Sequence, residues 1–235
     1  ITHCDTFHCD EVTGTAMLDY CFDGLDSILR TRDIAKITES LHNYYDNDGM
    51  YAGGNDKLYV LDVGLHYDPK KNHYDHHQES FTDTFDGKYT ILLSSCGLIW
   101  KHFGKNIINK MIRERCGGDG GGDGDGDNGV VNVDEVYDKF YRTFVIAIDA
   151  NDTGTSFVNK EKSGKVVFNY NNNISLSSIV SKFNADDVNN YDTQLKQFTK
   201  AKNVCKEIFT ASLYKTIIQN LNYNKHKPVF EEAFN

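Results

Sequence analysis

Short runs of β-branched and aromatic residues alternate with longer segments of helical periodicity along this chain of 235 residues. Strands that alternate with helices are typical of α/β domains, because the helices then cover the faces of a sheet. We therefore expect an α/β domain with a mostly parallel central sheet flanked by helices. Gly104 is expected to end the second helix. The expected strands cover residues 27–33 and 57–64, and the expected helices cover residues 7–22, 90–104, 133–148 and 192–221.

One low-complexity segment interrupts this alternation. Residues 117–129, GGDGGGDGDGDNG, hold no apolar side chain that could be buried, so they predict a solvated insert. A calcium loop is the alternative, because Asp123, Asp125 and Asp127 have part of the spacing of an EF-hand.

The charge balance excludes one class of protein. A formal net charge of −9 argues against a broad basic face that grips nucleic acid, so metal ions would have to supply positive charge for any phosphate substrate. The six cysteines form no CxxC pair, which fits reduced thiols better than a disulfide framework. No apolar run reaches the roughly 18 residues of a membrane span. We expect an intracellular protein without a membrane segment.

Histidines and acidic residues gather near the N-terminus, in THCDTFHCDE. His3, Asp5, His8, Asp10 and Glu11 lie where a strand is expected to turn into a helix near Asp10. Such a junction can present several side chains to one point. The alternative is that Asp10 only caps the helix and that the histidines lie on the surface.

Single carboxylates end two other apolar segments. In VLDVG, Asp62 ends a strand, where a buried unpaired carboxylate is costly and where ligands of open α/β sheets bind. The alternative is a turn-forming aspartate before Gly64. In AIDANDTG, Asp149 and Asp152 close a helix and enter a turn.

The densest group of histidines lies in YDHHQ. If Asp75, His76 and His77 are extended, His76 points to one face while the other two side chains point to the opposite face. His76 could then bind a metal ion while its neighbours orient it or reach a substrate. We therefore select His76 as a metal ligand and Asp75 and His77 as candidate catalytic residues.

The mixture of imidazole and carboxylate groups indicates the kind of metal. These donors suit manganese, zinc, iron or cobalt better than calcium. Two such ions hydrolyse phosphate esters, because they activate water and neutralise the phosphate oxygens. The alternative is a non-catalytic zinc-binding interaction protein, with a closed site made by His3, Cys4, His8 and Cys9.

Several motifs, taken in order, resemble one family. THCDTFHCDE, RTRD, VLDVGLHYDP, YDHHQESF and LSSCGLIWKHFG are similar to the melanocyte-proliferating-gene family, relatives of the DHH phosphoesterases. The resemblance implies a metal-dependent RNA exonuclease of nucleus or mitochondrion, with the cytoplasm as an alternative. It also implies a DHH-like catalytic domain over residues 1–155. Residues 156–235 would form a linking segment and the helical start of a second, truncated domain.

The resemblance implies roles for single residues. Asp62 would bridge two ions, His76 would be a ligand, and His77 would contact the substrate phosphate. The NDTG segment is similar to a DHH motif, which favours Asp152 over its substitute Asp149 as the last carboxylate. One ion would be held by His3, His8 and Asp62, and the other by Asp10, Asp62, His76 and Asp152.

His8 stands where DHH enzymes have an aspartate, so the expected manganese ions could be replaced by zinc, iron or magnesium. Arg30 and Arg32 are candidate phosphate contacts, because guanidinium groups make paired hydrogen bonds to phosphate oxygens. The alternative places them at an exposed strand end, paired with Asp33. The expected function is a two-metal 3′–5′ RNA exonuclease. A small-molecule phosphatase or pyrophosphatase of the same chemistry is the alternative.

Overall fold

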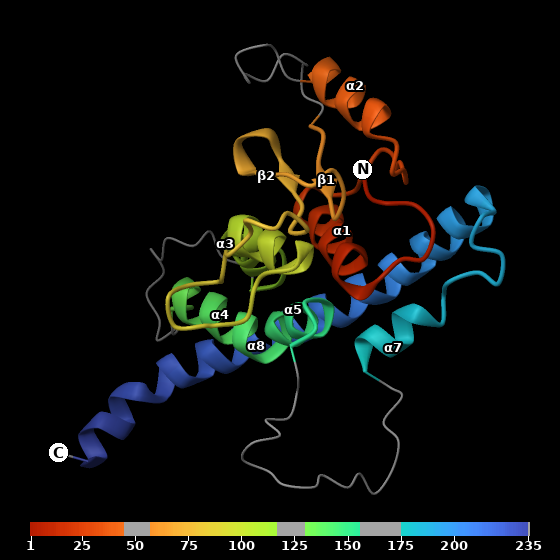
Figure 1. Ribbon diagram of the computed structural model, residues 1–235. Helices are drawn as coiled ribbons and strands as arrows, with labels where there is room; N and C mark the ends of the chain where they lie inside the picture. The colour runs from red at the N-terminus through yellow and green to blue at the C-terminus, as the bar shows by residue number, and fades with distance from the viewer. Residues whose placement is uncertain (45–56, 117–129, 156–174, 235) are drawn as a thin grey trace, which may run out of the picture.

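The structure, a computed structural model, describes residues 1–44, 57–116, 130–155 and 175–234 (Figure 1). The expected solvated insert over residues 117–129, with the aspartates of the alternative calcium loop, lies outside these residues. None of the described helices is both long enough and apolar enough to cross a membrane. The elements are α1 (Cys9–Cys21), α2 (Ile34–Tyr44), β1 (Val60–Leu61), β2 (Tyr67–Asp68), a 3-10 turn (Pro69–Lys71), β3 (His73–Tyr74), α3 (Ser95–Cys116), α4 (Val133–Phe140), a π-helical turn (Tyr141–Val145), α5 (Ile146–Asp152), α7 (Leu176–Ser181) and α8 (Tyr191–Phe234).

The fold class is α/β, but the sheet is small and mixed. Its strands are ordered β1-β3-β2, with β1 parallel and β2 antiparallel to β3. Backbone hydrogen bonds continue the parallel direction beyond β1, because the amide of Leu61 donates to Ile1 and Thr2 forms a parallel bridge with Arg30. The expected strand over residues 27–33 is therefore reduced to a bridge. A DHH-like fold and a mostly parallel sheet stay predictions.

Several helix boundaries differ from the expectation. The helix expected to end at Gly104 continues to Cys116 as α3. Gly104 is an interior position, where a Cβ atom would lie 2.8 Å from ring atoms of both Trp100 and Tyr137. The glycine thus serves the close approach of α4 rather than the end of a helix. The expected helix over residues 133–148 is present as α4 and α5, with the π-helical turn between them.

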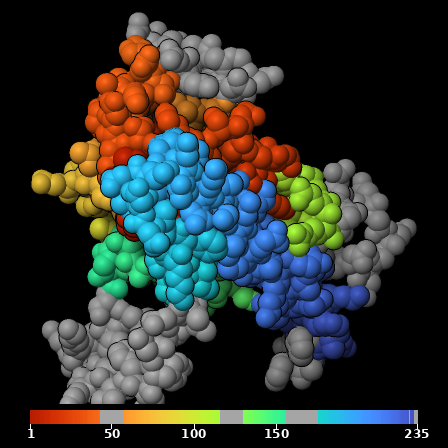
Figure 2. Space-filling model, turned by 90° about the vertical axis from the view of Figure 1, so that its right-hand side faces the viewer, coloured from red at the N-terminus to blue at the C-terminus, as the bar shows by residue number. Residues whose placement is uncertain are grey.

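The core is built around α1, which is buried along almost its whole length. It lies between α3 and α8, and Figure 1 shows α8 running behind it across the molecule. Figure 2 shows α7 and the first part of α8 covering the centre of one face. From α8, Phe198, Phe209 and Leu213 are fully buried in the same cluster as α1 and α3. Burial of each such side chain contributes about 1.5–3 kcal/mol, which holds α8 against α1 and α3. The expected division of the chain into a first domain over residues 1–155 and a second one over residues 156–235 stays a prediction.

Candidate metal centre

The parallel strands end at one edge, and the candidate ligands follow those ends. His3 follows the N-terminal bridge, Asp62 follows β1, and the segment 75–77 follows β3. The carboxyl ends of parallel strands meet at the same edge, which is where open α/β sheets bind ligands. Asp62 has a φ of 57°, in the left-handed region, while its amide still donates to Tyr74. This turn directs the Asp62 carboxylate toward the other ligands.

The start of α1 supplies the second group of side chains. His8 is the residue before the helix, and its amide donates to both carboxylate oxygens of Glu11 at 2.9 and 3.0 Å. A glutamate three residues into a helix often accepts this bond, which satisfies an amide that the helix leaves free. Asp10 is completely buried in the first turn. Acidic groups there interact favourably with the helix dipole.

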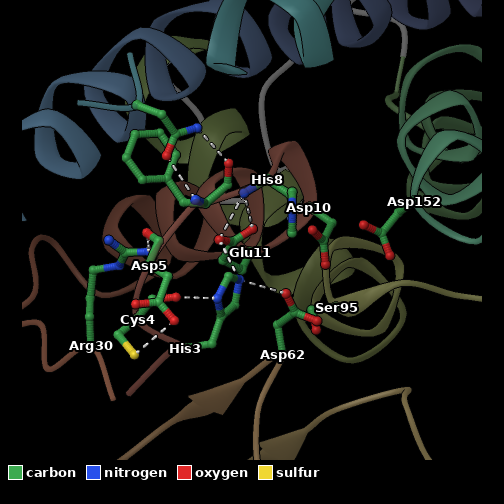
Figure 3. A network of polar contacts seen from close by, with 12 residues as sticks. His3, Cys4, Asp5, His8, Asp10, Glu11, Arg30, Asp62, Ser95 and Asp152 are labelled. Carbon is green, nitrogen blue, oxygen red and sulfur yellow. Dashed lines mark hydrogen bonds and ion pairs between the residues drawn. The ribbon is translucent and has the colours of Figure 1, made fainter. Parts of the chain in front are cut away.

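His3 lies between two carboxylates, as Figure 3 shows. Its Nε2 atom is 3.0 Å from Oε1 of Glu11 and 3.2 Å from Oδ2 of Asp62. On the other side of the ring, Nδ1 lies 2.7 Å from the carbonyl oxygen of Cys4, which can only accept a hydrogen bond. Nη2 of Arg32, which can only donate, lies 3.0 Å from the same Nδ1, so these two neighbours do not fix the tautomer of the ring. Nε2 faces the carboxylates, and a ligating histidine usually contacts a backbone carbonyl or another group through its other nitrogen in this way.

His76 and His77 both approach Asp62, which corrects the expected alternation. Nε2 of His76 is 3.3 Å from Oδ1 of Asp62 and 3.1 Å from Oδ2 of Asp152. Nδ1 of His77 is 3.3 Å from the same Asp62 oxygen and 2.7 Å from Oδ1 of Asp75. The two imidazole rings lie 4.4 Å apart. The backbone at residues 75–77 is not a strand, so neighbouring side chains need not point to opposite faces.

Asp75 acts through hydrogen bonds rather than by reaching the pocket. Its side chain is buried and accepts bonds from the amides of Leu65, His76 and His77. It also holds the His77 ring by the short contact to Nδ1. His73, the third histidine of this stretch, is buried against the carbonyl oxygen of Val63 and lies apart from the ligands.

Asp152 and Asp149 occupy different environments on α5. Figure 3 shows the carboxylate of Asp152 on the side of Asp10, and its oxygen lies next to His76. Asp149 is fully buried, and its Oδ1 atom accepts bonds from the amide and hydroxyl of Ser94 and the amide of Gly97. Burial raises the pKa of Asp149 to about 7, although these donors lower it. Asp149 thus holds the start of α3 and does not face the other ligands.

Buried polar atoms without a hydrogen-bond partner converge at this site. A buried donor or acceptor left unpaired costs about 1–3 kcal/mol, so several of them in one place need a compensating group. Cations would provide it, since every atom concerned can donate a lone pair. Among the described residues, the atoms here that make no hydrogen bond, although several lie at ion-pair distance from one another, are Nε2 of His3, both carboxylate oxygens of Asp10, Oδ1 of Asp62 and Nε2 of His76.

The pKa values of the site residues indicate an excess of negative charge that cations could balance. Burial alone would lower the pKa of His3, but the carboxylates of Asp62 and Glu11 outweigh it and raise the pKa to about 10. The pKa of His76 is raised to about 10 in the same way by Asp152 and Asp62. Burial, Asp62 and Glu11 hold the pKa of Asp10 well above its usual range. Protons thus supply the positive charge that metal ions would bring.

Three groups of these side chains have ligand atoms close enough to hold an ion. Within the described residues, none of the groups contains a cysteine, so the alternative zinc site with Cys4 and Cys9 has no support from the geometry. The sulfur of Cys4 lies 3.5 Å from Asp5, and that of Cys9 lies 3.6 Å from the Thr13 hydroxyl. The groups are His3, His8, Glu11 and Asp62; Asp62, His76 and His77; and His8, Asp10 and Asp152.

The two candidate phosphate contacts separate in the structure. Arg32 lines a pocket of about 410 Å³ together with the candidate ligands, and its side chain is more than half exposed. Arg30 is 3% exposed, and its guanidinium lies 5.2 and 5.0 Å from the rings of Phe7 and Phe198. It donates to the carbonyl oxygen of Asp5. Arg30 is therefore a core residue, which corrects its selection as a phosphate contact.

Glu11 was placed in the N-terminal cluster by the sequence pattern but was not selected as a metal ligand. It stands beside Asp10 in the sequence, and consecutive positions of a helix normally face different directions. The signal that could have identified it is the capping pattern, since a glutamate three residues after the helix start turns back toward that start. In the structure it lies in one group with His3, His8 and Asp62.

A family model described as "Uncharacterised protein family (UPF0160)", with the name MYG1_exonuc, matches residues 1–235. No solved structure matches the chain significantly. Three of the curated relatives illustrate the likeness. The "MYG1 protein YER156C" of Saccharomyces cerevisiae is 32% identical over 93% of this chain and 55% of its own length. The "MYG1 exonuclease" of Mus musculus is 31% identical over 96% of this chain and 50% of its own length, and that of Homo sapiens is 36% identical over 66% and 35%.

The chain spans about half the length of the curated relatives that it matches along most of its own length. The family expected from the ordered motifs is confirmed by the match over all 235 residues. This chain therefore belongs to the MYG1 family, UPF0160.

Proposed function

We propose that the chain carries a two-metal phosphodiesterase site whose substrate is RNA, cleaved from its 3′ end. The printed name of the mouse and human relatives, exonuclease, supports a nuclease. The observation that carries the chemistry is the convergence of unpartnered, buried nitrogen and oxygen atoms of His3, Asp10, Asp62 and His76. When bound, two divalent ions would activate water and neutralise phosphate oxygens.

The protein's own groups supply the remaining functions. Asp62 lies between His3 on one side and His76 and His77 on the other, which is the position of a bridging ligand. His77 is about half exposed, and Asp75 raises its pKa, so it can present a proton and positive charge to a substrate phosphate or leaving oxygen. Arg32 opens from the same pocket and can bind a second phosphate oxygen.

The size of the pocket favours cleavage at a chain end. A volume of about 410 Å³ lies in the lower part of the range for small-ligand sites. It holds about one nucleotide, and Arg32 is the single arginine or lysine among the described residues that line it. The same volume fits a mononucleotide, so a small-molecule phosphatase is the second candidate. Manganese is the proposed ion, with zinc, iron or magnesium as alternatives, and the nucleus or mitochondrion is the proposed location.

The test is a cleavage assay with the chain, Mn²⁺ and RNA labelled at either end. We expect single nucleotides to be released in order from the 3′ end, with little release from pyrophosphate or mononucleotides. Asp62→Asn and His76→Ala should each lower the rate by more than about 100-fold, as the loss of a catalytic electrostatic group does. Asp26→Asn, at an exposed position in the loop that follows the end of α1 at Cys21, is the matched control. Equal RNA cleavage by Asp62→Asn and the unmodified chain would contradict the proposal.

A further inference from the structure

A fully buried carboxylate lies in the ligand group without a role in the proposed site. The side chain of Glu11 has no exposed surface, and its Oε1 atom is 3.0 Å from Nε2 of His3. Its bond to the His8 amide fixes it in place. A carboxylate has about four acceptor positions, so this bond leaves others free to bind a cation.

The orientation of His3 is the second, independent observation. Nδ1 lies 2.7 Å from the Cys4 carbonyl oxygen and 3.0 Å from Nη2 of Arg32, and Nε2 on the other side of the ring points toward Glu11 and Asp62. His3 is 1% exposed, and Nε2 makes no hydrogen bond of good geometry among the described residues, although carboxylate oxygens lie 3.0 and 3.2 Å away. These three groups need positive charge among them, and a metal ion that replaces a proton on Nε2 would supply it.

Charge distribution points to the same residue. With His3, His8 and Asp62 alone, one ion would share a single bridging carboxylate, while the other would have three carboxylates around it. Glu11 supplies a full negative charge at the poorer position, and its ligand atom lies within 4.8 Å of those of the other three residues. An isolated divalent charge is costly to bury unless it is balanced.

We propose that Glu11 is a metal ligand, so that one ion is held by two imidazoles and two carboxylates. This inference rests on the proposed two-metal site and assigns to it a donor set of His3, His8, Glu11 and Asp62. Two nitrogens with two carboxylate oxygens suit manganese, iron or zinc better than calcium or magnesium.

The test counts bound Mn²⁺ by calorimetric titration of the chain and of Glu11→Gln. A glutamine can still accept the bond from the His8 amide, so the helix start is kept while the charge is lost. We expect two ions on the unmodified chain and one on Glu11→Gln, or an affinity at one position that falls by more than about 100-fold, beyond the loss typical of an outer contact. Asp5→Asn removes a charge from the same segment outside the ligand groups and should keep both ions.

Relocating the charge gives a second variant. His8→Asp combined with Glu11→Gln returns a carboxylate to the same group and should restore binding of two ions. Two ions on Glu11→Gln, bound less than about 100-fold more weakly, overturn the ligand assignment alone. Fewer than two ions on the unmodified chain overturn the proposed function with it.

A crystal grown with Zn²⁺ provides a readout that needs no variant. Anomalous scattering should place an ion about 2.0–2.2 Å from a Glu11 oxygen. An ion bound by His3, His8 and Asp62 but beyond 3 Å from Glu11, which is outside the roughly 2.2 Å limit of a Zn–O bond, would overturn the assignment.

Discussion

Aspartates three residues apart on α5 have opposite roles in this structure. Asp149 receives three hydrogen bonds and anchors the start of α3, whereas Asp152 lies 3.1 Å from Nε2 of His76. Sequence alone favoured Asp152 only through its NDTG context, because both residues end the same helix. The difference arises from what each side chain meets after folding, and this is a property of distant residues such as Ser94 and Gly97.

Matched substitutions separate these roles. Asp152→Asn should lower the affinity for Mn²⁺ by more than about tenfold, because a charged group of the metal centre is lost. Asp149→Asn should leave that affinity unchanged, since an amide oxygen can accept the bonds from Ser94 and Gly97 and since the pKa of about 7 already leaves Asp149 partly neutral. Titration calorimetry measures both. A larger loss of Mn²⁺ affinity in Asp149→Asn than in Asp152→Asn would show that Asp149, and not Asp152, belongs to the metal centre.

At the scale of elements, tight contacts decide where the helices lie. Gly97 and Gly104 both face atoms that leave no room for a Cβ, those of Asp149 in one case and of Trp100 and Tyr137 in the other. A glycine in a helical pattern can therefore indicate either the end of the helix or a position where another element packs closely against it. The sequence could not decide between them, because Tyr137 belongs to a separate helix.

Gly104→Ala tests the close approach. Alanine favours a helix over glycine by about 1 kcal/mol, but overpacking against rigid rings at 2.8 Å costs about 1–3 kcal/mol. We expect a net loss of about 1 kcal/mol in the free energy of unfolding, measured by urea denaturation. Gly87→Ala, where a Cβ meets nothing within 4 Å, should change it by less than about 0.5 kcal/mol. A more stable Gly104→Ala protein would show that the helices can separate without cost.

A charged contact joins α1 to α8 and depends on pH. The carboxylate oxygens of Asp19 lie 2.7 Å from Nζ of Lys202 and 2.6 Å from Nζ of Lys206. Burial alone would raise the pKa of Asp19, but the two lysines outweigh it and lower the pKa. A lowered pKa in the folded state stabilises the fold above the unfolded value of about 3.9. This contribution is lost as the pH falls through the folded pKa.

Asp19→Asn should therefore destabilise the chain at pH 7 and much less at acidic pH. Hydrogen bonds to charged groups contribute about 1.5–3 kcal/mol, which is the expected loss at pH 7. Below about pH 4 the difference from the unmodified chain should begin to shrink, because Asp19 of the unfolded chain takes up a proton, and it is lost once the pH falls through the lowered pKa of the folded chain. Urea denaturation at about pH 7, 5, 3.5 and 2.5 measures it, with Glu207→Gln on the exposed side of α8 as control. A loss independent of pH would assign it to packing instead of charge.

Across the whole molecule, the features that depend on local sequence patterns could be predicted, and those that depend on contacts between distant residues could not. His3, Asp62 and His76 could be selected because each follows an extended segment, and the strand ends do meet. The burial of Arg30 between aromatic rings could not be predicted, because Phe198, one of the two rings, is 168 positions away in the sequence. The mixed sheet could not be predicted for another reason. Its strands β2 and β3 have only two residues each, which is too short for a pattern of alternating side chains.

We also expect the candidate metal centre to lower the stability of the whole fold when no cation is bound. Asp10 is completely buried with both oxygens unpartnered among the described residues, and its pKa is held well above the usual range, so in the absence of an ion the carboxyl group costs free energy either by staying charged or by taking up a proton on folding. Replacing it with an amide, which does not ionise, should stabilise the metal-free chain, as happens when a strained functional residue is replaced. The same substitution should weaken the response to metal, because Asp10 belongs to the proposed ligand set.

Asp10→Asn should thus raise the melting temperature in EDTA but reduce the increase caused by Mn²⁺. At 100 times the dissociation constant, each bound ion adds about 2.7 kcal/mol, which for a chain of this size is about 5–10 °C. The unmodified chain should show at least this increase, and Asp10→Asn should lose at least half of it. Scanning calorimetry with EDTA or Mn²⁺ measures both effects, and Asp26→Asn, which removes an exposed charge, should behave like the unmodified chain. A lower melting temperature of Asp10→Asn in EDTA would show that the buried carboxylate stabilises the fold, and the proposed cost of preparing the site would be wrong.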